Sequence, residues 1–361
     1  MTALGRQRPV LRRRHAPALF LPATAMAAAA ASGSSRVLQA TEFGEGTSKF
    51  VFSELPARAP EADEVQVSVT RAAINPIDWK VTRGYMKGAW ACPLPFNVGY
   101  DFAGKVEAVG SAVTDLKVGQ SVCGVSWGEG HHGSDAKTIG GAFADNITIA
   151  ASKVAVVPEG VSADEAAAMA LVGTTAHQAL FRELKVEAGQ RLLILGGAGA
   201  VGLIAVQLAK LRGVHVTTTA SSRTSSFVEG FGPDRVIDYN SEDWSKDEAV
   251  KGVDAVFDAI GDKDGLARAK TVLKEDGKYL SIANMECGFD PAAHPPLTYA
   301  AFMCLAADNK VLAEILALMA DKKVRVPVDE TFPFTAEGVA ALFAKQEAGK
   351  SLGKNVLAIK E

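Results

Sequence analysis

LLILGGAGAVGLIAVQLAKL, the sequence of Leu192–Leu211, is the clearest indication of the fold. Its first four residues are a short apolar run that predicts a buried strand, and the apolar residues from Leu203 to Leu211 predict a helix. Further short apolar runs follow, separated by helical patterns, so this part of the chain is expected to form βαβ units with a parallel sheet. The other predicted strands of that sheet are Val214–Thr218, Arg235–Ile237, Ala255–Ala259 and Lys278–Ile282.

The turn after the first of these strands contains the pattern G-x-G-x-x-G as Gly197, Gly199 and Gly202. Glycine at these positions allows a tight turn, a close approach of a pyrophosphate to the backbone, and tight packing of the helix on the strand. The helix N-terminus offers free N–H groups to phosphates. We therefore expect a dinucleotide here, with Ala200 and Val201 also in contact with it. A glycine-rich turn without a ligand is the alternative.

The next predicted strand indicates which dinucleotide is preferred. NAD-binding proteins place an Asp or Glu at the end of this strand to bind the ribose 2′-hydroxyl. This chain has no acidic residue at the end of Val214–Ala220. The chain continues with Ser221, Ser222 and Arg223, which offer hydroxyls and a guanidinium to a 2′-phosphate. NADPH is the predicted cofactor, although Arg223 alone could be a solvated residue at the start of a helix.

The segment from Val37 to about Pro158 has a different texture, with short strands separated by Gly, Pro and Asp. At the other end of the chain, a helix over Asn309–Asp321 and a closing strand over Asn355–Ile359 are expected, and the closing strand is expected to return to this first segment. The strands predicted in the first segment are Glu64–Ile74, Ala103–Val109, Ser121–Val125, Phe143–Ala150 and Val154–Val157.

Composition excludes several classes of function. The net charge of −3 provides no field that favours nucleic acid, so a small molecule is the expected partner. Cys92, Cys123, Cys287 and Cys304 are widely spaced, which argues against a disulfide framework and a thiolate metal cluster.

The first 41 residues are rich in Arg and contain no Asp or Glu, a composition typical of an organelle transit peptide. We assign residues 1–35 to it, and a secretory signal or a disordered segment is the alternative. Pro17 and Pro22 interrupt the apolar run, which is shorter than the roughly 20 residues of a membrane span. A plastid is favoured over a mitochondrion, with secretory or cytoplasmic locations as alternatives.

Beyond the glycine turn, the chain resembles the medium-chain dehydrogenase/reductase superfamily, and in it the zinc-free quinone oxidoreductase and alkenal/enone reductase branch. The resemblance extends from Val37 to Glu361 and rests on ordered motifs rather than on any single one. These motifs are Asn75-Pro76-Ile77-Asp78, Val98-Gly99-Tyr100-Asp101-Phe102-Ala103-Gly104, Gly141-Ala142-Phe143-Ala144, Val236-Ile237-Asp238-Tyr239, Phe257-Asp258-Ala259-Ile260-Gly261 and Gly353-Lys354.

The resemblance implies an α/β protein with a GroES-like β-rich catalytic domain (36–161 and 324–361), a Rossmann NADPH-binding domain (162–323) and an active site between them. It places Tyr239 at the adenosine end of NADPH, Thr175 against the cofactor, Ile260 and Gly261 at the nicotinamide half, and Gly353 and Lys354 at the closing edge of the cleft. Tyr239 could instead be a core aromatic at a strand end, and Lys354 a surface charge.

The resemblance also implies a metal-free site. Zinc-dependent members place a cysteine where this chain has Ile77-Asp78 and a histidine where it has Tyr100. His131 and His132 are adjacent in a loop and lack an evident third ligand, so they are expected to be solvated. No metal is predicted.

The implied reaction is hydride transfer from NADPH to an enal or enone, or to a quinone. Asn75, Lys80 and Tyr85 are the candidate catalytic residues, as donors to the acceptor's carbonyl oxygen, while Lys80 could instead bind NADPH or be an exposed lysine at a strand end. A zinc-free alcohol or polyketide-type enoyl reductase, a nucleotide-binding protein without turnover, and envelope association through the N-terminal segment stay open. A homodimer is the protein partner that the family makes plausible.

Overall fold

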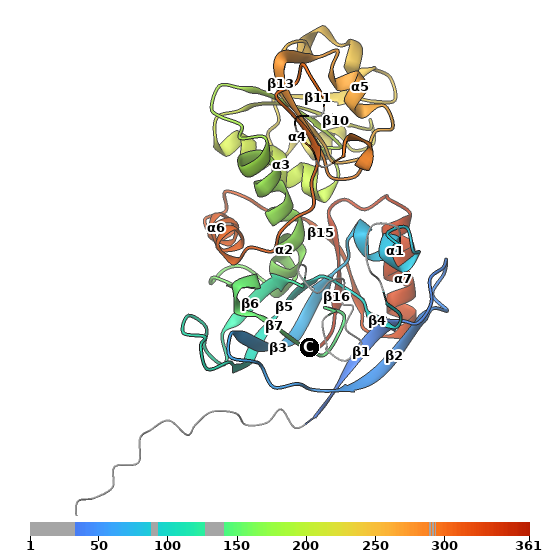
Figure 1. The fold of residues 1–361 in the computed structure, drawn as a ribbon, viewed down its shortest axis with the longest axis vertical. Coiled ribbons are helices and arrows are strands. Elements are labelled where there is room, and N and C mark those ends of the chain that lie inside the picture. Colours follow the sequence, from blue (N-terminus) through green and yellow to red (C-terminus); the bar gives the residue numbers. More distant parts are fainter. Residues whose placement is uncertain (1–32, 88–92, 127–140, 289, 291, 293) are drawn as a thin grey trace, which may run out of the picture.

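The computed structural model describes residues 33–87, 93–126, 141–288, 290, 292 and 294–361 of the chain. The predictions for residues 1–32, Cys92, His131 and His132 lie outside these residues. Figure 1 shows two lobes, with the helix α2 (Ala163–His177) at their junction.

One lobe contains a six-stranded parallel sheet in the order β11-β10-β9-β12-β13-β14. Its first strand, β9, lies between β10 and β12, so the chain builds the sheet outward in one direction and then in the other. This is the Rossmann order, and it confirms the predicted fold class. The strands are β9 (Arg191–Leu195), β10 (His215–Ala220), β11 (Arg235–Asp238), β12 (Val253–Asp258), β13 (Leu273–Ser281) and β14 (Tyr299–Phe302).

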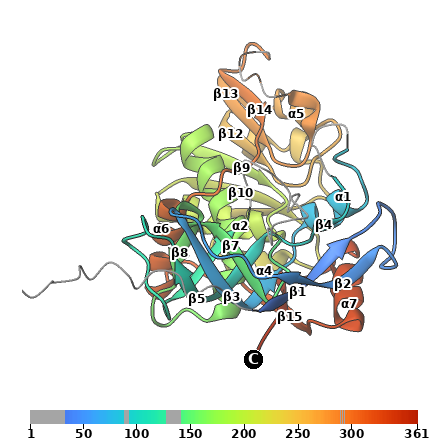
Figure 2. The same ribbon diagram turned by 60° about the horizontal axis from the view of Figure 1, so that its bottom comes forward.

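Helices and helical turns connect these strands, and the views in Figures 1 and 2 show them on the faces of the sheet. Leu192–Leu195 of β9 and Ala255–Asp258 of β12 are buried, as strands covered on both faces should be. The connecting elements are α3 (Ala200–Leu211), α4 (Ser225–Glu229), η3 (Trp244–Lys246), η4 (Glu248–Val250), α5 (Gly265–Ala269) and η5 (Met285–Cys287).

The other lobe is β-rich. A seven-stranded sheet runs β15-β16-β3-β5-β6-β8 with β7 paired to β3, and a three-stranded sheet runs β2-β1-β4. The C-terminal strand β16 pairs antiparallel with β3, so the end of the chain lies in the sheet of the N-terminal lobe. The strands are β1 (Ser34–Ala40), β2 (Phe50–Pro56), β3 (Glu64–Ala73), β4 (Phe96–Asn97), β5 (Asp101–Val109), β6 (Ser121–Val125), β7 (Asn146–Ala150), β8 (Val154–Val156), β15 (Val328–Pro333) and β16 (Lys354–Ala358).

The helix α2 packs against both lobes. Its residues from Ala166 to Ala176 are all buried, and it contacts β3 and β5 on one side and α3 on the other. The small side chains of its alanine-rich sequence let these elements approach closely. The remaining helical elements are α1 (Pro76–Thr82), η1 (Ala151–Lys153), the π-helical turn η2 (Gln178–Glu183), α6 (Asn309–Ala320) and α7 (Ala336–Glu347).

Several parts of the β-rich lobe differ from the sequence predictions. The strands β1, β2 and β4 and the helix α1 were not expected, and β1 begins before the predicted end of the leader at residue 35. The predicted strand Phe143–Ala150 is wrong in its first half, because only Asn146–Ala150 forms a strand. Phe143 instead donates its backbone N–H to Val98 and accepts from Leu38, which links two separate segments.

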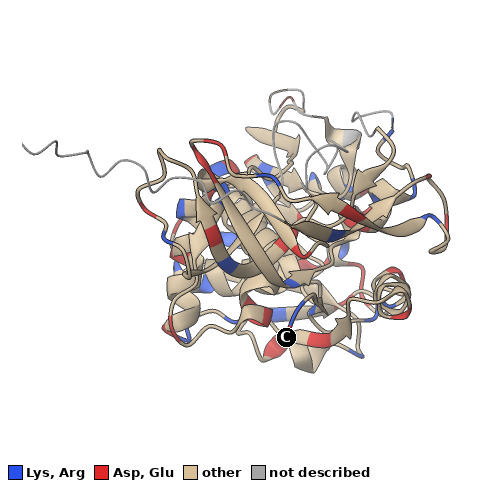
Figure 3. Ribbon diagram, turned by 90° about the horizontal axis from the view of Figure 1, so that it is seen from below, with Lys and Arg blue, Asp and Glu red and all other residues tan. Residues whose placement is uncertain are grey.

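Acidic and basic residues are not separated into regions of one sign in the view of Figure 3. Figure 3 shows both signs interspersed along the same strands and helices, in keeping with the small net charge. Within the described ranges, no helix is both long and apolar enough to cross a membrane.

Candidate active site

A cavity of about 580 Å³ lies at the carboxyl ends of the central parallel strands and is bordered by residues of both lobes. The Rossmann lobe contributes the turns after β9 and β12, and the β-rich lobe contributes α1 and the segment before β16. This is the crevice where a doubly wound sheet binds its ligand. The predicted site residues that line the cavity are Asn75, Lys80, Thr175, Gly199, Ala200, Val201, Gly202, Ile260, Gly353 and Lys354.

The glycine turn has one face against the protein and one face toward the cavity. A Cβ atom on Gly197 would lie 2.2 Å from Thr218 Oγ1, and one on Gly202 would lie 2.2 Å from the carbonyl oxygen of Gly196. A Cβ on Gly199 would meet no protein atom closer than 3.4 Å. Packing therefore explains two of the glycines, whereas the backbone at Gly199 is open to a ligand that needs a close approach.

The helix α3 begins directly at this open glycine. Gly199 is its N-cap and has no side chain to accept from the free N–H groups of the first turn. These N–H groups and the positive end of the helix are available to an anion. The structure thus provides the cradle that a pyrophosphate requires.

The turn after β12 forms another edge of the cavity. The Asp258 carboxylate, which is fully buried, accepts N–H bonds from Ile260 at 3.0 Å and Gly261 at 2.8 Å. Its other oxygen accepts from Tyr279 and Ser281. Burial raises the pKa of Asp258, and the backbone donors oppose part of that rise. This carboxylate fixes a turn that leaves the Ile260 side chain 57% exposed at the cavity.

A second cavity of about 420 Å³ adjoins the first, since Ile260 lines both. Tyr239 also lines it and is 55% exposed, so the alternative of a core aromatic at a strand end is wrong. Ser222 and Arg223 are exposed at the carboxyl end of β10, and Ser221 bonds to Thr224. Among the described residues, no carboxylate forms an ion pair with Arg223.

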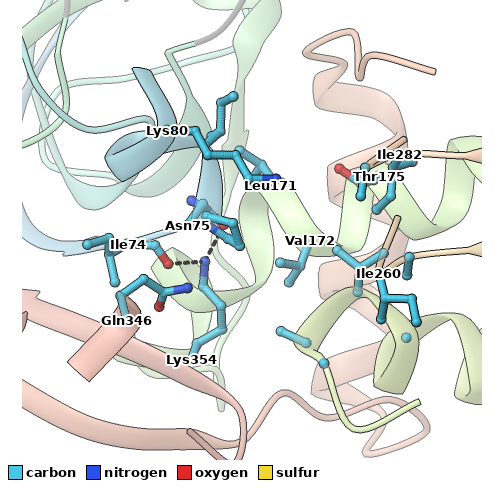
Figure 4. Close-up of a pocket in the computed structure, with 18 of the residues that line it drawn as sticks. Ile74, Asn75, Lys80, Leu171, Val172, Thr175, Ile260, Ile282, Gln346 and Lys354 are labelled. Carbon is cyan, nitrogen blue, oxygen red and sulfur yellow. Dashed lines mark hydrogen bonds between the residues drawn. The ribbon is translucent and has the colours of Figure 1, made fainter. Parts of the chain in front are cut away.

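Lys80 projects from α1 toward the large cavity and is only partly exposed (Figure 4). The alternative of an exposed lysine at a strand end is therefore wrong. Its ammonium lies 5.9 Å from the ring centroid of Trp79 and donates no hydrogen bond to another described residue. Burial lowers the pKa of Lys80 below its ordinary value of 10.5.

Lys354 lies on the floor of the same cavity, only 4% exposed, so its alternative as a surface charge is also wrong. Its ammonium donates to the carbonyl oxygen of Ile74 at 2.8 Å, to Asn75 Oδ1, and to Asp101 Oδ2 at 3.1 Å. Figure 4 shows the first two of these bonds. Burial raises the pKa of Asp101, and the Lys354 ammonium counteracts that rise.

Tyr85 is placed differently from the other two predicted catalytic residues. Its side chain is 63% exposed and packs edge-on against Trp79, and it is not among the residues that line the large cavity. Sequence reasoning attached no function to several apolar residues that do line it. These include Ile77, Trp79, Leu171, Val172, Ile282, Phe302, Met303 and Leu305.

Comparison with known proteins agrees with this architecture. The family model for the alcohol dehydrogenase GroES-like domain matches residues 61–159, and the model for a zinc-binding dehydrogenase matches residues 231–357. The NADPH-dependent alkenal/one oxidoreductase from chloroplasts of Arabidopsis thaliana is 34% identical over 82% of this chain and 72% of its own length. The chain belongs to the medium-chain dehydrogenase/reductase superfamily.

Two further members of the superfamily show the extent of the similarity. The chloroplastic quinone-oxidoreductase homolog of Spinacia oleracea is 36% identical over 56% of this chain, and the chain spans 61% of that relative's length. The crystal structure of Escherichia coli quinone oxidoreductase complexed with NADPH matches with a TM-score of 0.74 and 25% identity, over 90% of this chain and 99% of the other.

The resemblance to the superfamily places the cysteine and histidine ligands of its zinc-dependent members at Ile77-Asp78 and Tyr100, where this chain has neither a cysteine nor a histidine. Asp78 is buried, and its Oδ2 accepts the backbone N–H of Asn75 at 2.7 Å. Over the residues described, no three His, Cys, Asp or Glu side chains come together as a group that could hold a metal ion.

Proposed function

We propose that this protein is an NADPH-dependent reductase that transfers a hydride to the β-carbon of an enal or enone. The observation that carries the proposal is the large cavity, where an open phosphate-binding turn and the partly buried ammonium of Lys80 lie on the two sides of one cleft. The relatives support it, since one is named as an NADPH-dependent alkenal/one oxidoreductase. A quinone is the second candidate acceptor, supported by the names of the other two proteins.

The proposed position of NADPH follows the two cavities. Its pyrophosphate would lie on Gly199, Ala200 and Val201 at the start of α3, with Gly197 and Gly202 shaping the turn. Its adenosine end would extend toward Tyr239 in the second cavity. Ser221, Ser222 and Arg223 do not line that cavity but directly follow β10, and they would hold the 2′-phosphate.

The nicotinamide end of the proposed cofactor would lie in the large cavity. Thr175 and Ile260, which line the cavity, would border it, and Gly353 lines the cavity next to Lys354. Gly261 does not line the cavity, but it follows Ile260 in the turn that Asp258 holds. Because Ile260 lines both cavities, one extended molecule could run along the carboxyl edge of the sheet from one to the other.

The bound cofactor supplies the hydride. Lys80 would donate a hydrogen bond to the acceptor's carbonyl oxygen. This bond would stabilise the negative charge that develops on that oxygen when the β-carbon accepts the hydride. The resulting enolate then takes a proton at its α-carbon. Because burial lowers its pKa, the Lys80 ammonium is a stronger acid than an exposed lysine, and it would supply this proton directly or through water. The side chain of Asn75 is already bonded to Lys354 and Asp101, so Lys80 is the stronger candidate.

We also propose that the reaction needs no zinc. The absence of a cysteine at Ile77-Asp78 and of a histidine at Tyr100, where the resemblance places zinc ligands, supports this, as does the buried bond between Asn75 N–H and Asp78. Without a Lewis acid, the acceptor must be intrinsically electrophilic, which favours conjugated carbonyls and quinones over simple ketones.

Turnover of a panel of acceptors tests the proposed function. NADPH oxidation would be followed with a short enal, a longer enone and a benzoquinone, each repeated with NADH. Faster turnover of the enal and enone with NADPH supports the proposal, and turnover of the quinone alone supports the second candidate. Tight NADPH binding without any turnover would contradict both, and would favour a nucleotide-binding role.

We propose a plastid location for the mature protein. The chloroplastic relatives and the Arg-rich N-terminal segment support this. Residues 1–35 fused to a fluorescent protein should direct it to plastids in a plant cell, and a signal in mitochondria or the cytosol would contradict the proposal. Sedimentation of the purified protein would test the expected homodimer.

A further inference from the structure

We propose that Lys354 and Asp101 are positioning residues, which hold helix α1 and therefore set the place of Lys80 in the cleft. This inference rests on the proposed function of Lys80. It gives Lys354 a different role from the cofactor-binding role at the closing edge of the cleft that the family resemblance implies.

The ammonium of Lys354 has no hydrogen-bond donor left for a cofactor or substrate. An ammonium has three N–H donors, and those of Lys354 point at Ile74 O, Asn75 Oδ1 and Asp101 Oδ2. The residue is 4% exposed although it lines the cavity. Its charge is therefore used inside the protein, underneath the site.

Asp101 joins this ammonium to the helix at the junction of the lobes. One carboxylate oxygen accepts the backbone N–H of Leu171 in α2 at 2.8 Å, and the other accepts from Asn75 Nδ2 at 2.9 Å and from Lys354. Asp101 is fully buried at the start of β5. A buried carboxylate is tolerated only when it is paired and hydrogen-bonded. Loss of the Lys354 ammonium should therefore also disturb the bonds from Asn75 and Leu171 to Asp101.

Asn75 transmits the arrangement to Lys80. Asn75 is the N-cap of α1, and its backbone N–H is held by Asp78 in the first turn of that helix. Lys80 is on the same short helix. The pair formed by Lys354 and Asp101 thus connects β16, β5 and α2 to the helix that carries the proposed donor.

A double-mutant cycle tests whether Lys354 acts through Lys80. If it does, Lys354→Met should lower kcat/KM about 10-fold or more in the wild-type background, but less than about 2-fold in a Lys80→Met background. The Kd for NADPH should change by less than about 3-fold in Lys354→Met, because the ammonium does not touch the cofactor. Lys354→Arg, which keeps the charge, should restore part of the lost kcat/KM.

The matched control is Lys360→Met. Lys360 is also a partly buried lysine near the C-terminus, and it donates to Ser68 and Asn146 away from the cavity. We expect this variant to keep the wild-type kcat/KM.

Several results would overturn the inference. These are additive effects of Lys354→Met and Lys80→Met, or a rise in the Kd for NADPH that accounts for the lost kcat/KM. If Lys80→Met has no effect in an active enzyme, the inference fails while the proposed reaction stands. A wild-type protein without turnover overturns both.

Removal of Lys354 alone leaves Asp101 as an unpaired buried charge and could unfold the protein. The variant Asp101→Asn/Lys354→Met removes both charges and keeps a group that can accept from Leu171. This double variant should also lower kcat/KM about 10-fold or more in the wild-type background, but less than about 2-fold when it is combined with Lys80→Met.

Discussion

At the scale of single residues, the most unusual group near the cleft is the carboxyl of Asp78. It is buried, and its Oδ1 atom has no hydrogen-bond partner among the described residues. Burial raises its pKa to about 7, and the nearby carboxylate of Asp101 contributes to the rise. This group should therefore make stability depend on pH.

The sign of that dependence follows from the two pKa values. The unfolded chain loses the Asp78 proton near its ordinary pKa of 3.8, whereas the folded protein keeps it up to about pH 7. The free energy of unfolding should thus fall as pH rises from about 4 to 7, by an upper limit of about 4 kcal/mol. Asp78→Asn should remove this contribution. Denaturant unfolding of both proteins across this pH range measures it, and parallel curves would contradict the assignment.

Arg223 should decide the preference between the two nicotinamide cofactors. Arg223→Ala removes the guanidinium proposed to bind the 2′-phosphate, so KM for NADPH should rise about 10-fold or more. KM for NADH, which lacks this phosphate, should stay unchanged and is the internal control. Steady-state kinetics with both cofactors checks this, and an equal effect on both would remove Arg223 from the phosphate site.

At the scale of elements, the glycines of the turn between β9 and α3 have different roles. Gly197 is required for packing, whereas Gly199 is open to a ligand. Gly199→Ala should leave the apo protein stable, because Gly199 has a helix-compatible φ of −74° and room for a Cβ. It should raise the Kd for NADPH about 10-fold or more, since the methyl group would occupy the space of the pyrophosphate.

The matched variant is Gly197→Ala, which should destabilise the apo protein because its Cβ collides with Thr218. Thermal unfolding without ligand and NADPH titration distinguish the two variants. Normal NADPH affinity in Gly199→Ala would mean that the pyrophosphate does not lie on this turn.

The elements that the sequence predicted well are those with a local signal. The glycine turn between β9 and α3 is specified by residues adjacent in the chain, and the predicted strand Ser121–Val125 is β6 without change. The helix α1 was missed because Asn75-Pro76 also favours a turn. The shortened strand near Phe143 was missed because distant backbone at Val98 and Leu38 determines it.

At the scale of the whole molecule, the site depends on contacts that no local pattern contains. Lys354 and Asn75 are 279 residues apart in the chain and bonded in the fold. Their motifs indicated that each residue lies near the cleft. The motifs did not indicate that the Lys354 ammonium donates a hydrogen bond to the Asn75 side chain. One signal for Asp101 was present, because a carboxylate at the start of an apolar strand requires a buried partner.

The two lobes also explain why activity should need the whole molecule. The proposed phosphate-binding turn belongs to the Rossmann sheet, whereas Lys80 belongs to the β-rich lobe, and α2 packs against both. The cofactor that supplies the hydride would therefore be bound by the Rossmann lobe, and the proton would come from Lys80 in the β-rich lobe. The acceptor would be held in the cleft between the two lobes.

Deuterium labelling follows the hydride itself and tests the proposed reaction. The protein would be supplied with an enone and with NADPH that carries deuterium in place of both hydrogens at nicotinamide C4, and the product would be analysed by NMR. Hydride transfer to the β-carbon predicts deuterium at the β-carbon of a saturated ketone. Deuterium at the carbonyl carbon of an unsaturated alcohol, or no deuterium in the product, would contradict the proposed reaction.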